Sequence, residues 1–496
     1  MYESKYRKYI TKNNSRFAEQ EEIADGLTPL VDASGVYTAG VPLGRSRDTI
    51  LVDGGDGHTV AIGPTGCKKT RTAAFTTALS VISAGESAVI NDPKCEIYRR
   101  TAALAKKKKA IVKVLNFRKP SRSHHWNPLM PAYHYAKAGN NDAAIECLAE
   151  FAGSVIAPGL KNTNDRYWQD VSREFLISVC LLLLATENPE MINMHNLIPF
   201  CYESSYPALK AVLEQMDDSH PAAAGLHAVV DLEAERTRSC IYGSLLAMLG
   251  PFIQNKGLQD MLSGDTFDLT DIARKQVIVY LIYPDEKSSM DFLVNMFLTQ
   301  CYEVLINCAS ETADDRLPIR CNFILDEFSN ITPIERFSNR ISESRGKNIR
   351  FFLFLQSYDQ LRTKYGDEAN AILANCNNWL CWSSKDVSFV KNEISPICGN
   401  EIDFNGIEHP LIGPVEMQFL KKSLDSAEVL VLRQGKHPYI TSLPDVDYIE
   451  QFRTIPALNI IGHIEHCPCR LFDVDGWIKL LTDGEIPMPY PKKDVA

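Results

Sequence analysis

The segment Gly63–Thr70 constrains the fold of this chain more than any other stretch of its 496 residues. It reads GPTGCKKT and directly follows the apolar run Thr59–Ile62, which indicates a buried strand. A strand that ends in a glycine-rich loop, with Lys-Thr at the start of a helix, is typical of a phosphate-binding loop (P-loop). Backbone N–H groups in such a loop cradle the phosphates of ATP, the lysine reaches the β and γ oxygens, and the hydroxyl binds Mg²⁺. The predicted nucleotide-binding residues are Gly63, Thr65, Gly66, Cys67, Lys68, Lys69 and Thr70, with Thr70 also a Mg²⁺ ligand.

One position in this loop departs from the motif. The pattern G-x-x-x-x-G-K-[ST] requires glycine at position 68, where this chain has Lys68. Glycine allows the backbone to approach the phosphates closely, so the Lys68 side chain either crowds the nucleotide or swings out of its way. The prediction is a loop that binds ATP, with efficient hydrolysis left open. The alternative is a glycine turn before a lysine-rich helix.

Length and charge restrict the class of protein. The chain is too long for one ordinary core, so we expect two or three packed units. Its net charge of −10 excludes a uniformly basic surface but is compatible with a local basic lining. No secretory signal follows Met1, and the longest apolar run, Phe175–Ala185, is shorter than the ~20 residues of a membrane helix. We therefore expect a cytoplasmic protein.

The 14 cysteines are scattered without C-x-x-C pairs, which fits reduced thiols rather than a disulfide framework. Cys467 and Cys469, with His463 and His466 nearby, are a candidate metal site. Their spacing does not match the usual zinc modules, so we expect no zinc there.

Strands and helices alternate on both sides of a long helical stretch. After the loop, the pattern predicts a helix over 71–84, a strand that begins at Ser87 and ends in Asp92-Pro93, a helix over 96–107 and a strand over 110–117. This alternation favours right-handed βαβ units and a mostly parallel sheet. The predicted organisation is a polar segment at 1–35, the first part of a nucleotide-binding domain at 36–132, an all-α insertion at 133–262, the second part of the nucleotide-binding domain at 263–450, and a tail at 451–496.

Positive charge is concentrated between Lys94 and Arg122. This stretch has eleven Lys or Arg residues against one acid, Glu96. Such an excess in an acidic protein can neutralise several phosphates of a nucleic acid. A solvated helix face is an equally good interpretation of the same charges.

Two acidic residues follow a later predicted strand, Arg320–Leu325. In a P-loop protein, adjacent acids at the end of a buried strand hold the Mg²⁺ shell and polarise the attacking water, which assigns these roles to Asp326 and Glu327. The next predicted strand ends in Gln356, which can bind the γ-phosphate or its water, or simply cap the strand.

The order of these segments resembles one family: the type IV secretion coupling proteins, TraG/TraD-like conjugative DNA-transfer ATPases related to FtsK and HerA. The resemblance extends from about Gly40 to Asp447. The segments that carry it are GVPLGR, HTVAIGPTGCKKT, NDPKCEIYRRT, WNPL, YWQDVSREFLISVCLLLL, ERTRSCIYGSLLAML, FILDEFSNI, FFLFLQSYDQLRTKYGDEANAILANCNNWLCWSSKD and VLVLRQGKHPYI.

The resemblance implies an α/β fold, with a RecA-like P-loop NTPase domain interrupted by an all-α domain. It also implies a homo-hexameric ring that hydrolyses ATP with Mg²⁺ and delivers DNA, or a relaxase or other secreted protein, to a type IV secretion channel. Lys69, Thr70, Asp326, Glu327 and Gln356 fall on the family's motif positions. Arg345 falls where relatives have an arginine finger, which would act on the neighbouring subunit's nucleotide.

Three features depart from the family pattern. Cys67 and Lys68 replace small residues of the loop, Cys95 replaces a usual glycine, and no membrane anchor precedes the domain, so membrane contact is expected only through a partner. Two functions stay open: an ATP-driven DNA translocase, favoured by the intact acids and Arg345, and a diverged adaptor with little or no hydrolysis, favoured by Lys68. A small-molecule phosphotransferase is disfavoured by the helical insertion.

Overall fold

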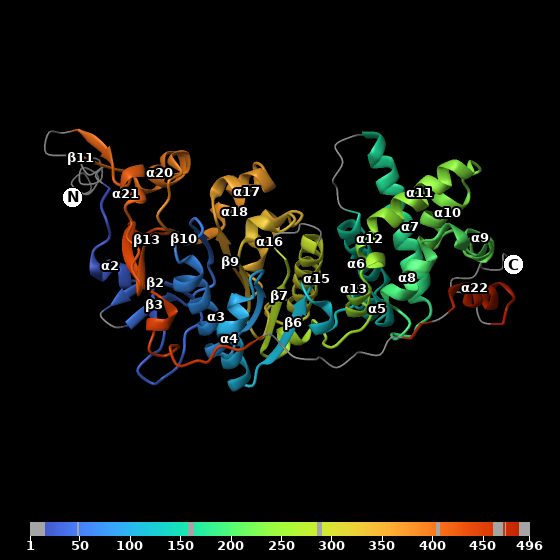
Figure 1. Cartoon of the computed structure of the whole chain (residues 1–496), viewed down its shortest axis with the longest axis horizontal. Helices are drawn as coiled ribbons and strands as arrows, with labels where there is room; N and C mark the ends of the chain where they lie inside the picture. Colours follow the sequence, from blue (N-terminus) through green and yellow to red (C-terminus); the bar gives the residue numbers. More distant parts are fainter. Residues whose placement is uncertain are drawn as a thin grey trace. The chain divides into compact units, whose positions relative to one another are not determined.

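The computed structural model describes residues 15–46, 49–156, 163–284, 290–402, 407–459, 470–471 and 473–485, without the side chains of 163–166 and 482. The described residues divide into two compact units, drawn together in Figure 1. Residues 15–114, 269–284 and 305–459 form the first unit, and residues 115–268, 290–304 and 470–485 form the second. The first unit is built on a large sheet, and the second is mostly helical.

A nine-stranded sheet organises the first unit, in the order β14-β13-β10-β4-β9-β8-β5-β7-β6. The five strand pairs from β10 to β7 are parallel, whereas β13 is antiparallel to both of its neighbours. The sheet is therefore mostly parallel, as the sequence predicts. The strands are β4 His58–Ile62, β5 Ser87–Asn91, β6 Ile111–Asn116, β7 Val277–Ile282, β8 Cys321–Leu325, β9 Ile349–Leu355, β10 Cys376–Cys381, β13 Ser426–Arg433 and β14 Tyr439–Pro444.

The central strands are buried along their whole length. Every residue of β4, β5, β7, β8 and β9 is buried, which is expected where helices cover both faces of a parallel sheet. Figure 1 draws β9 between two groups of helices, with α3 and α4 on one side and α16, α17 and α18 on the other. These helices are α3 Phe75–Ala84, α4 Glu96–Lys107, α16 Phe337–Ser344, α17 Tyr358–Tyr365 and α18 Glu368–Ala374.

Small antiparallel strands precede the P-loop strand. They form a sheet in the order β1-β3-β2, from β1 Thr28–Pro29, β2 Val41–Ser46 and β3 Thr49–Asp53. A short helix, α2 Gln20–Ala24, comes before them, and a separate hairpin pairs β11 Asn400–Ile402 with β12 Glu408–Pro410.

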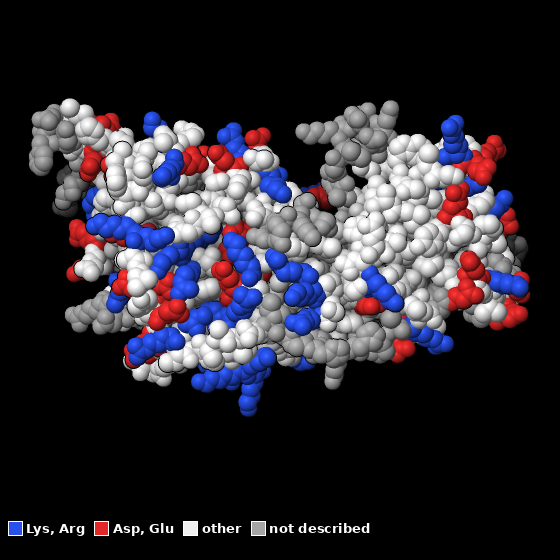
Figure 2. Space-filling model, in the orientation of Figure 1, with Lys and Arg blue, Asp and Glu red and all other residues white. Residues whose placement is uncertain are grey.

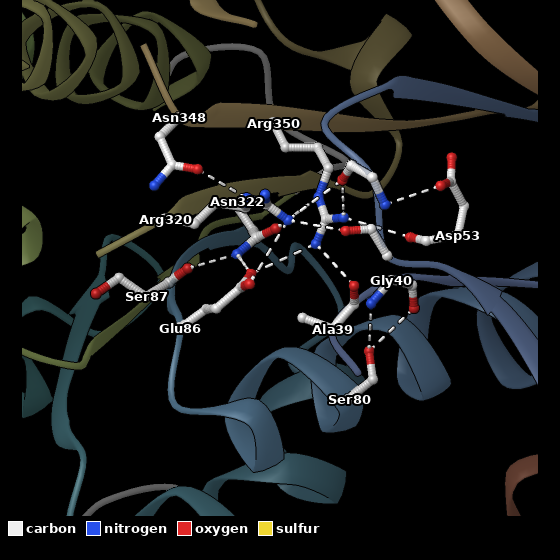
Figure 3. Close-up of polar contacts among 12 residues, drawn as sticks. Ala39, Gly40, Asp53, Ser80, Glu86, Ser87, Arg320, Asn322, Asn348 and Arg350 are labelled. Atoms are coloured by element: carbon white, nitrogen blue, oxygen red, sulfur yellow. Dashed lines mark hydrogen bonds and ion pairs between the residues drawn. The ribbon is translucent and has the colours of Figure 1, made fainter. Parts of the chain in front are cut away.

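A buried polar network joins the amino ends of the central strands. Figure 3 shows the guanidinium of Arg350, on β9, surrounded by acceptors. Its Nε donates to Asn322 Oδ1 at 3.0 Å, Nη1 donates to the carbonyl of Gly55 at 2.7 Å, and Nη2 donates to the carbonyl of Ala39 at 3.1 Å. Nη2 also pairs with Glu86 Oε2 at 3.4 Å. Because every polar group of the guanidinium has an acceptor, the fold can bury a charged side chain that is only 1% exposed.

The second unit contains the predicted helical stretch. Its longest helix, α7, packs most extensively against α10, and at Gly225 an added Cβ would lie 2.2 Å from the carbonyl oxygen of Glu174. Glycine is therefore required where α10 crosses α7 this closely. The helices are α5 Met130–Lys137, α6 Asn141–Val155, α7 Thr163–Leu184, α8 Met194–Phe200, α9 Tyr206–Gln215, α10 Pro221–Val230, α11 Glu235–Met248, α12 Gly250–Gln254 and α13 Lys256–Met261.

The helical unit is larger than the predicted insertion at 133–262, because it spans residues 115–268 and includes two later segments. The tail helix α22 Val474–Thr482 packs on α9 of the helical unit, with the Trp477 ring 6.2 Å from that of Phe200. Residues 290–304, at the start of α15 Asp291–Ser310, also belong to this unit, where Gln300 accepts a hydrogen bond from the Trp126 indole. Hydrophobic periodicity indicates that a segment is helical, but not which unit its apolar face meets.

Among the described helices, only α15 is long and apolar enough to cross a membrane. Its apolar window is 78% buried inside the protein, as in a core helix. The twelve cysteines in the described ranges are free thiols. No group of three or more metal-binding side chains occurs among the residues with described positions, and the candidate site at Cys467 and Cys469, with His463 and His466, lies outside them.

Candidate nucleotide-binding site

Most of the predicted site residues meet at the carboxyl ends of neighbouring strands. The P-loop follows β4, Gln356 follows β9, and Asp326 and Glu327 follow β8. In the sheet, β4 lies beside β9 and β9 lies beside β8, all in parallel. Their carboxyl ends therefore form one edge, where ligands of open α/β sheets bind.

The P-loop has a backbone conformation that favours glycine at several positions. A Cβ added to Gly63 would lie 2.7 Å from Cys67 Sγ and 2.9 Å from Trp382 Cβ, so the loop is closely packed there. Gly66 has φ +81° and Lys68 has φ +73°, both in the left-handed region. The chain then enters a π-helical turn, Thr70–Ala74, which continues into α3. The loop thus keeps the conformation that glycine favours at position 68, although a left-handed non-glycine residue costs roughly 1–2 kcal/mol.

The two lysines of the loop point to different partners. Lys69 is buried, and its Nζ donates to the carbonyl oxygens of Leu355, at 2.7 Å, and Gly63, at 3.4 Å. Lys68 Nζ donates instead to the carbonyl of Leu424 and forms an ion pair with Asp445 Oδ2 at 3.0 Å. The sequence leaves open whether the Lys68 side chain crowds the nucleotide or swings out of its way. In the structure it bonds to residues outside the loop.

The loop tip, Pro64–Gly66, is exposed, and Cys67 and Thr70 are half-buried. Burial raises the pKa of the Cys67 thiol, which keeps it neutral. Lys422 Nζ donates to the carbonyl of Gly66 at 2.7 Å. Thr65 thus lies at the exposed tip, and Thr70 begins the turn beneath it.

Asp326 is a buried carboxylate with an incomplete set of partners. Its side chain is almost fully buried, and Oδ1 accepts no hydrogen bond from any residue that the structure describes. Burial raises the pKa of Asp326 to about 6, although the charge of Lys69 opposes this shift. An oxygen that is shielded from water and lacks a donor fits a cation ligand, so the fold suits Mg²⁺ at this position.

Glu327 is held by two side chains from neighbouring strand ends. Lys94 Nζ binds its Oε1 at 2.9 Å, and Gln356 Nε2 donates to its Oε2 at 2.7 Å. Burial alone would raise the pKa of Glu327, but these hydrogen bonds and the charge of Lys69 outweigh it, and the pKa lies below its ordinary value. The Glu327 carboxylate is therefore ionised, and its orientation is fixed. The sequence predicts Glu327 and Gln356 here, but assigns Lys94 only to a basic stretch.

A further carboxylate, Asp92, follows β5 at the same edge and was missed by the sequence analysis. It accepts the backbone N–H groups of Glu96, at 2.9 Å, and Tyr98, at 2.7 Å, and so caps the start of α4. Burial raises its pKa to about 7. Cys95, beside this cap, has φ +59°, the left-handed conformation for which glycine is the usual residue.

Arg345 lies away from this cluster. It follows α16 and precedes β9, at the amino edge of the sheet, whereas Gln356 lies at the carboxyl end of the same strand. Its Nε pairs with Asp56 Oδ1 at 3.1 Å, and half of its side chain is exposed. The structure thus brings together Lys69, Asp326, Glu327 and Gln356 but not Arg345.

One known protein family matches most of this chain. The family model described as "Type IV secretory system Conjugative DNA transfer" matches residues 10–401. The chain belongs to this family. No curated protein matches it.

Solved structures of the bacterial conjugative coupling protein TrwB share its fold. A sulphate complex of TrwB has a TM-score of 0.63 at 15% identity, covering 90% of this chain and 97% of that one. TrwB with the ATP analogue ADPNP has a TM-score of 0.60 at 16% identity, covering 91% and 98%. TrwB with ADP and Mg²⁺ has a TM-score of 0.59 at 16% identity, covering 88% and 94%. The α/β fold with a mostly parallel sheet and a helical unit is therefore confirmed.

Proposed function

We propose that this chain is an ATP-driven DNA translocase that delivers DNA, or a relaxase bound to DNA, to a type IV secretion channel. The observation that carries the proposal is the set of charged and polar side chains on three adjacent strand ends. Lys69 lies on the P-loop, Asp326 keeps a buried oxygen without a donor among the described residues, and Glu327 is oriented by Gln356. Family membership supports the role in conjugative DNA transfer.

The site residues fit ATP and Mg²⁺. The related fold of TrwB has been solved with an ATP analogue and with ADP and Mg²⁺. In this chain Thr70 and Asp326 would hold the metal, whose charge would neutralise the phosphate oxygens. Lys69 would bind phosphate oxygens with N–H donors of its ammonium, which in the described structure donates to the carbonyls of Leu355 and Gly63. Backbone N–H groups of the loop between Thr65 and Thr70 would cradle the phosphates.

Glu327 would orient the attacking water, with Lys94 and Gln356 as positioning residues. Both side chains hold Glu327 in the described arrangement, and the ammonium of Lys94 lowers its basicity. Each oxygen of Glu327 keeps a further acceptor site through which it can bind the attacking water. Because Gln356 lies between β9 and Glu327, it is suited to report the state of the nucleotide to the strand that carries it.

Arg345 would act in a neighbouring copy of the chain. It lies at the opposite edge of the sheet from its own P-loop, half-exposed and paired only weakly with Asp56. An arginine in this place can contribute to catalysis only where copies assemble, which favours the homo-hexameric ring.

We propose that the basic stretch 94–122 binds DNA. Lys94 and Arg100 are engaged within the first unit, by Glu327 and Asp447 respectively, so they are not available to phosphates. Arg99 and the run Lys106–Lys109, on and after α4, are exposed. Figure 2 shows Lys and Arg side chains gathered around the place where α4 lies in Figure 1. We propose a cytoplasmic location, with membrane contact through the secretion channel.

The test is ATP turnover by the purified full chain, with and without DNA. We expect turnover that DNA stimulates, no ATP binding in Lys69→Ala, and ATP binding with turnover reduced by about 10²–10³-fold in Glu327→Gln. Unchanged turnover in Glu327→Gln would remove its assigned role. ATP binding without turnover under every DNA condition would favour the adaptor function instead.

A further inference from the structure

Lys68 belongs to a cluster of ion pairs beside the P-loop. The Asp445 cluster consists of Lys68, Arg71, Asp445 and Asp447. Arg71 binds Asp445 through Nε at 2.6 Å and Nη2 at 2.7 Å, and Lys68 Nζ binds the same carboxylate at 3.0 Å. Arg71 also pairs with Asp447. Two cations that immediately flank the Lys69-Thr70 pair therefore share one acid.

The central acid of this cluster is fixed from several sides. The side chain of Asp445 is 1% exposed, and its backbone N–H donates to the carbonyl of Asp425 at 2.7 Å. Burial raises the pKa of Asp445, but the hydrogen bonds from Arg71 and Lys68 outweigh it and leave the pKa below its ordinary value. A buried carboxylate of this kind depends on its partners, because removing one leaves an uncompensated charge.

Asp445 directly follows β14, the edge strand of the main sheet, and the segment before β13 reaches the same loop. Lys422 donates to the carbonyl of Gly66, and the carbonyl of Leu424 accepts from Lys68. Residues 422–424 and 445 thus contact the loop on both sides of Cys67. The Lys68 side chain is 15% exposed, so its ammonium is fixed between these two segments rather than free in solvent.

We propose that Lys68 is a positioning residue that ties the P-loop to the β13–β14 edge. The motif glycine at this position gives the loop its left-handed backbone but no anchor. Lys68 keeps that backbone, with φ +73°, and adds an ion pair that offsets its conformational cost. The departure from the motif then prepares the loop to receive phosphates instead of blocking it. This inference deepens the proposed function, since the loop is the proposed ATP site.

The test compares variants of the full chain by two measurements. Hydrogen exchange of the amides of residues 65–70, recorded without nucleotide, reports how firmly the loop is held. We expect exchange roughly tenfold faster in Lys68→Met and Lys68→Gly than in the parent, and near-parental exchange in Lys68→Arg, which restores the cation. The dissociation constant for ATP should rise by a similar factor in the first two variants and not in the third.

A matched control is Lys347→Met. Lys347 pairs with Asp315, and its side chain is 14% exposed against 15% for Lys68, but it lies outside the nucleotide site. Neither loop exchange nor ATP affinity should change in this variant. Lys68→Met combined with Asp445→Asn should have an effect smaller than the sum of the two single effects.

Two results separate this inference from the proposed function. Unchanged loop exchange in Lys68→Gly, or tighter ATP binding by that variant, would overturn the anchoring role. A parent that bound no ATP would overturn the proposed function, while the exchange measurement, made without nucleotide, would still decide whether Lys68 holds the loop.

Discussion

The two edges of the central sheet both bury charged side chains, but they satisfy them differently. At the amino edge, Arg350 has acceptors for all of its nitrogens within the first unit. At the carboxyl edge, Asp326 is equally buried, yet its Oδ1 has no donor among the described residues. Within the described part of the chain, Lys69 there binds only backbone carbonyls.

This difference separates architecture from ligand binding. A buried charge without partners costs several kcal/mol, so a fold can keep one only where another molecule completes it. The amino edge is complete and holds strands together. The carboxyl edge is incomplete and is therefore the place to expect a ligand.

The largest effect is predicted at the complete edge. Arg350→Met removes the guanidinium and takes the donor from Asn322 Oδ1 and from the carbonyl of Ala39, while Glu86 keeps Asn322 and Arg320 as partners. We expect the free energy of unfolding to fall by roughly 3–5 kcal/mol, the usual cost of breaking a buried charged network. Urea denaturation of parent and variant measures it. A loss below about 1 kcal/mol would show that the network adds little stability, so the two edges would not differ in the way described.

His58 gives the same edge a dependence on pH. It is buried at the start of β4, and its Nδ1 accepts the backbone N–H of Phe351 at 3.1 Å. Burial lowers the pKa of His58 from 6.5 to about 4, so the unfolded chain binds a proton at a higher pH than the folded chain does. The contribution of His58 to the free energy of unfolding is fully present above pH 6.5. It falls by about 3 kcal/mol as the pH drops toward 4.

His58→Gln serves as the comparison, because it cannot gain a proton in this range. The difference in unfolding free energy between parent and His58→Gln should shrink by about 3 kcal/mol between pH 7 and pH 4. A constant difference across this range would mean that His58 titrates alike in both states.

Several site residues could be predicted from the sequence because strand order determines where they meet. Lys69, Asp326, Glu327 and Gln356 each follow an apolar run, and parallel strands bring their carboxyl ends to one edge. The pairing of Lys68 with Asp445 and that of Lys94 with Glu327 could not be predicted in this way. Asp445 is 377 residues from Lys68, and these contacts depend on tertiary packing rather than on local pattern.

Two of the departures from the family pattern have a common explanation. Lys68 and Cys95 stand where glycine is usual, and both have a left-handed backbone, with φ +73° and +59°. The chain has therefore changed the side chains but kept the conformation. A sequence shows that glycine is missing, whereas only the structure shows that its backbone angle remains.

A smaller effect, of opposite sign, is predicted at the incomplete edge. Asp326→Asn removes a buried negative charge that lacks a full set of donors, so we expect the free energy of unfolding to rise by about 1–2 kcal/mol near pH 7. The same variant should lose the Mg²⁺-dependent part of ATP binding. Denaturation and ATP titration with and without Mg²⁺ measure the two effects. A fall in stability would show that Asp326 is a structural acid like those of the other edge.

The smallest effect on stability is expected for Arg345, the exposed charge of the amino edge. Its pair with Asp56 is open to solvent, with half of the Arg345 side chain exposed, so Arg345→Ala should change the free energy of unfolding by less than about 1 kcal/mol. Turnover should nevertheless fall strongly in the assembled protein and not in a sample shown to be monomeric. The matched variant Arg320→Ala, at the same edge but bonded to Asn348 and Gly54, should lose stability instead. Equal loss of turnover by monomeric and assembled Arg345→Ala would exclude action between copies.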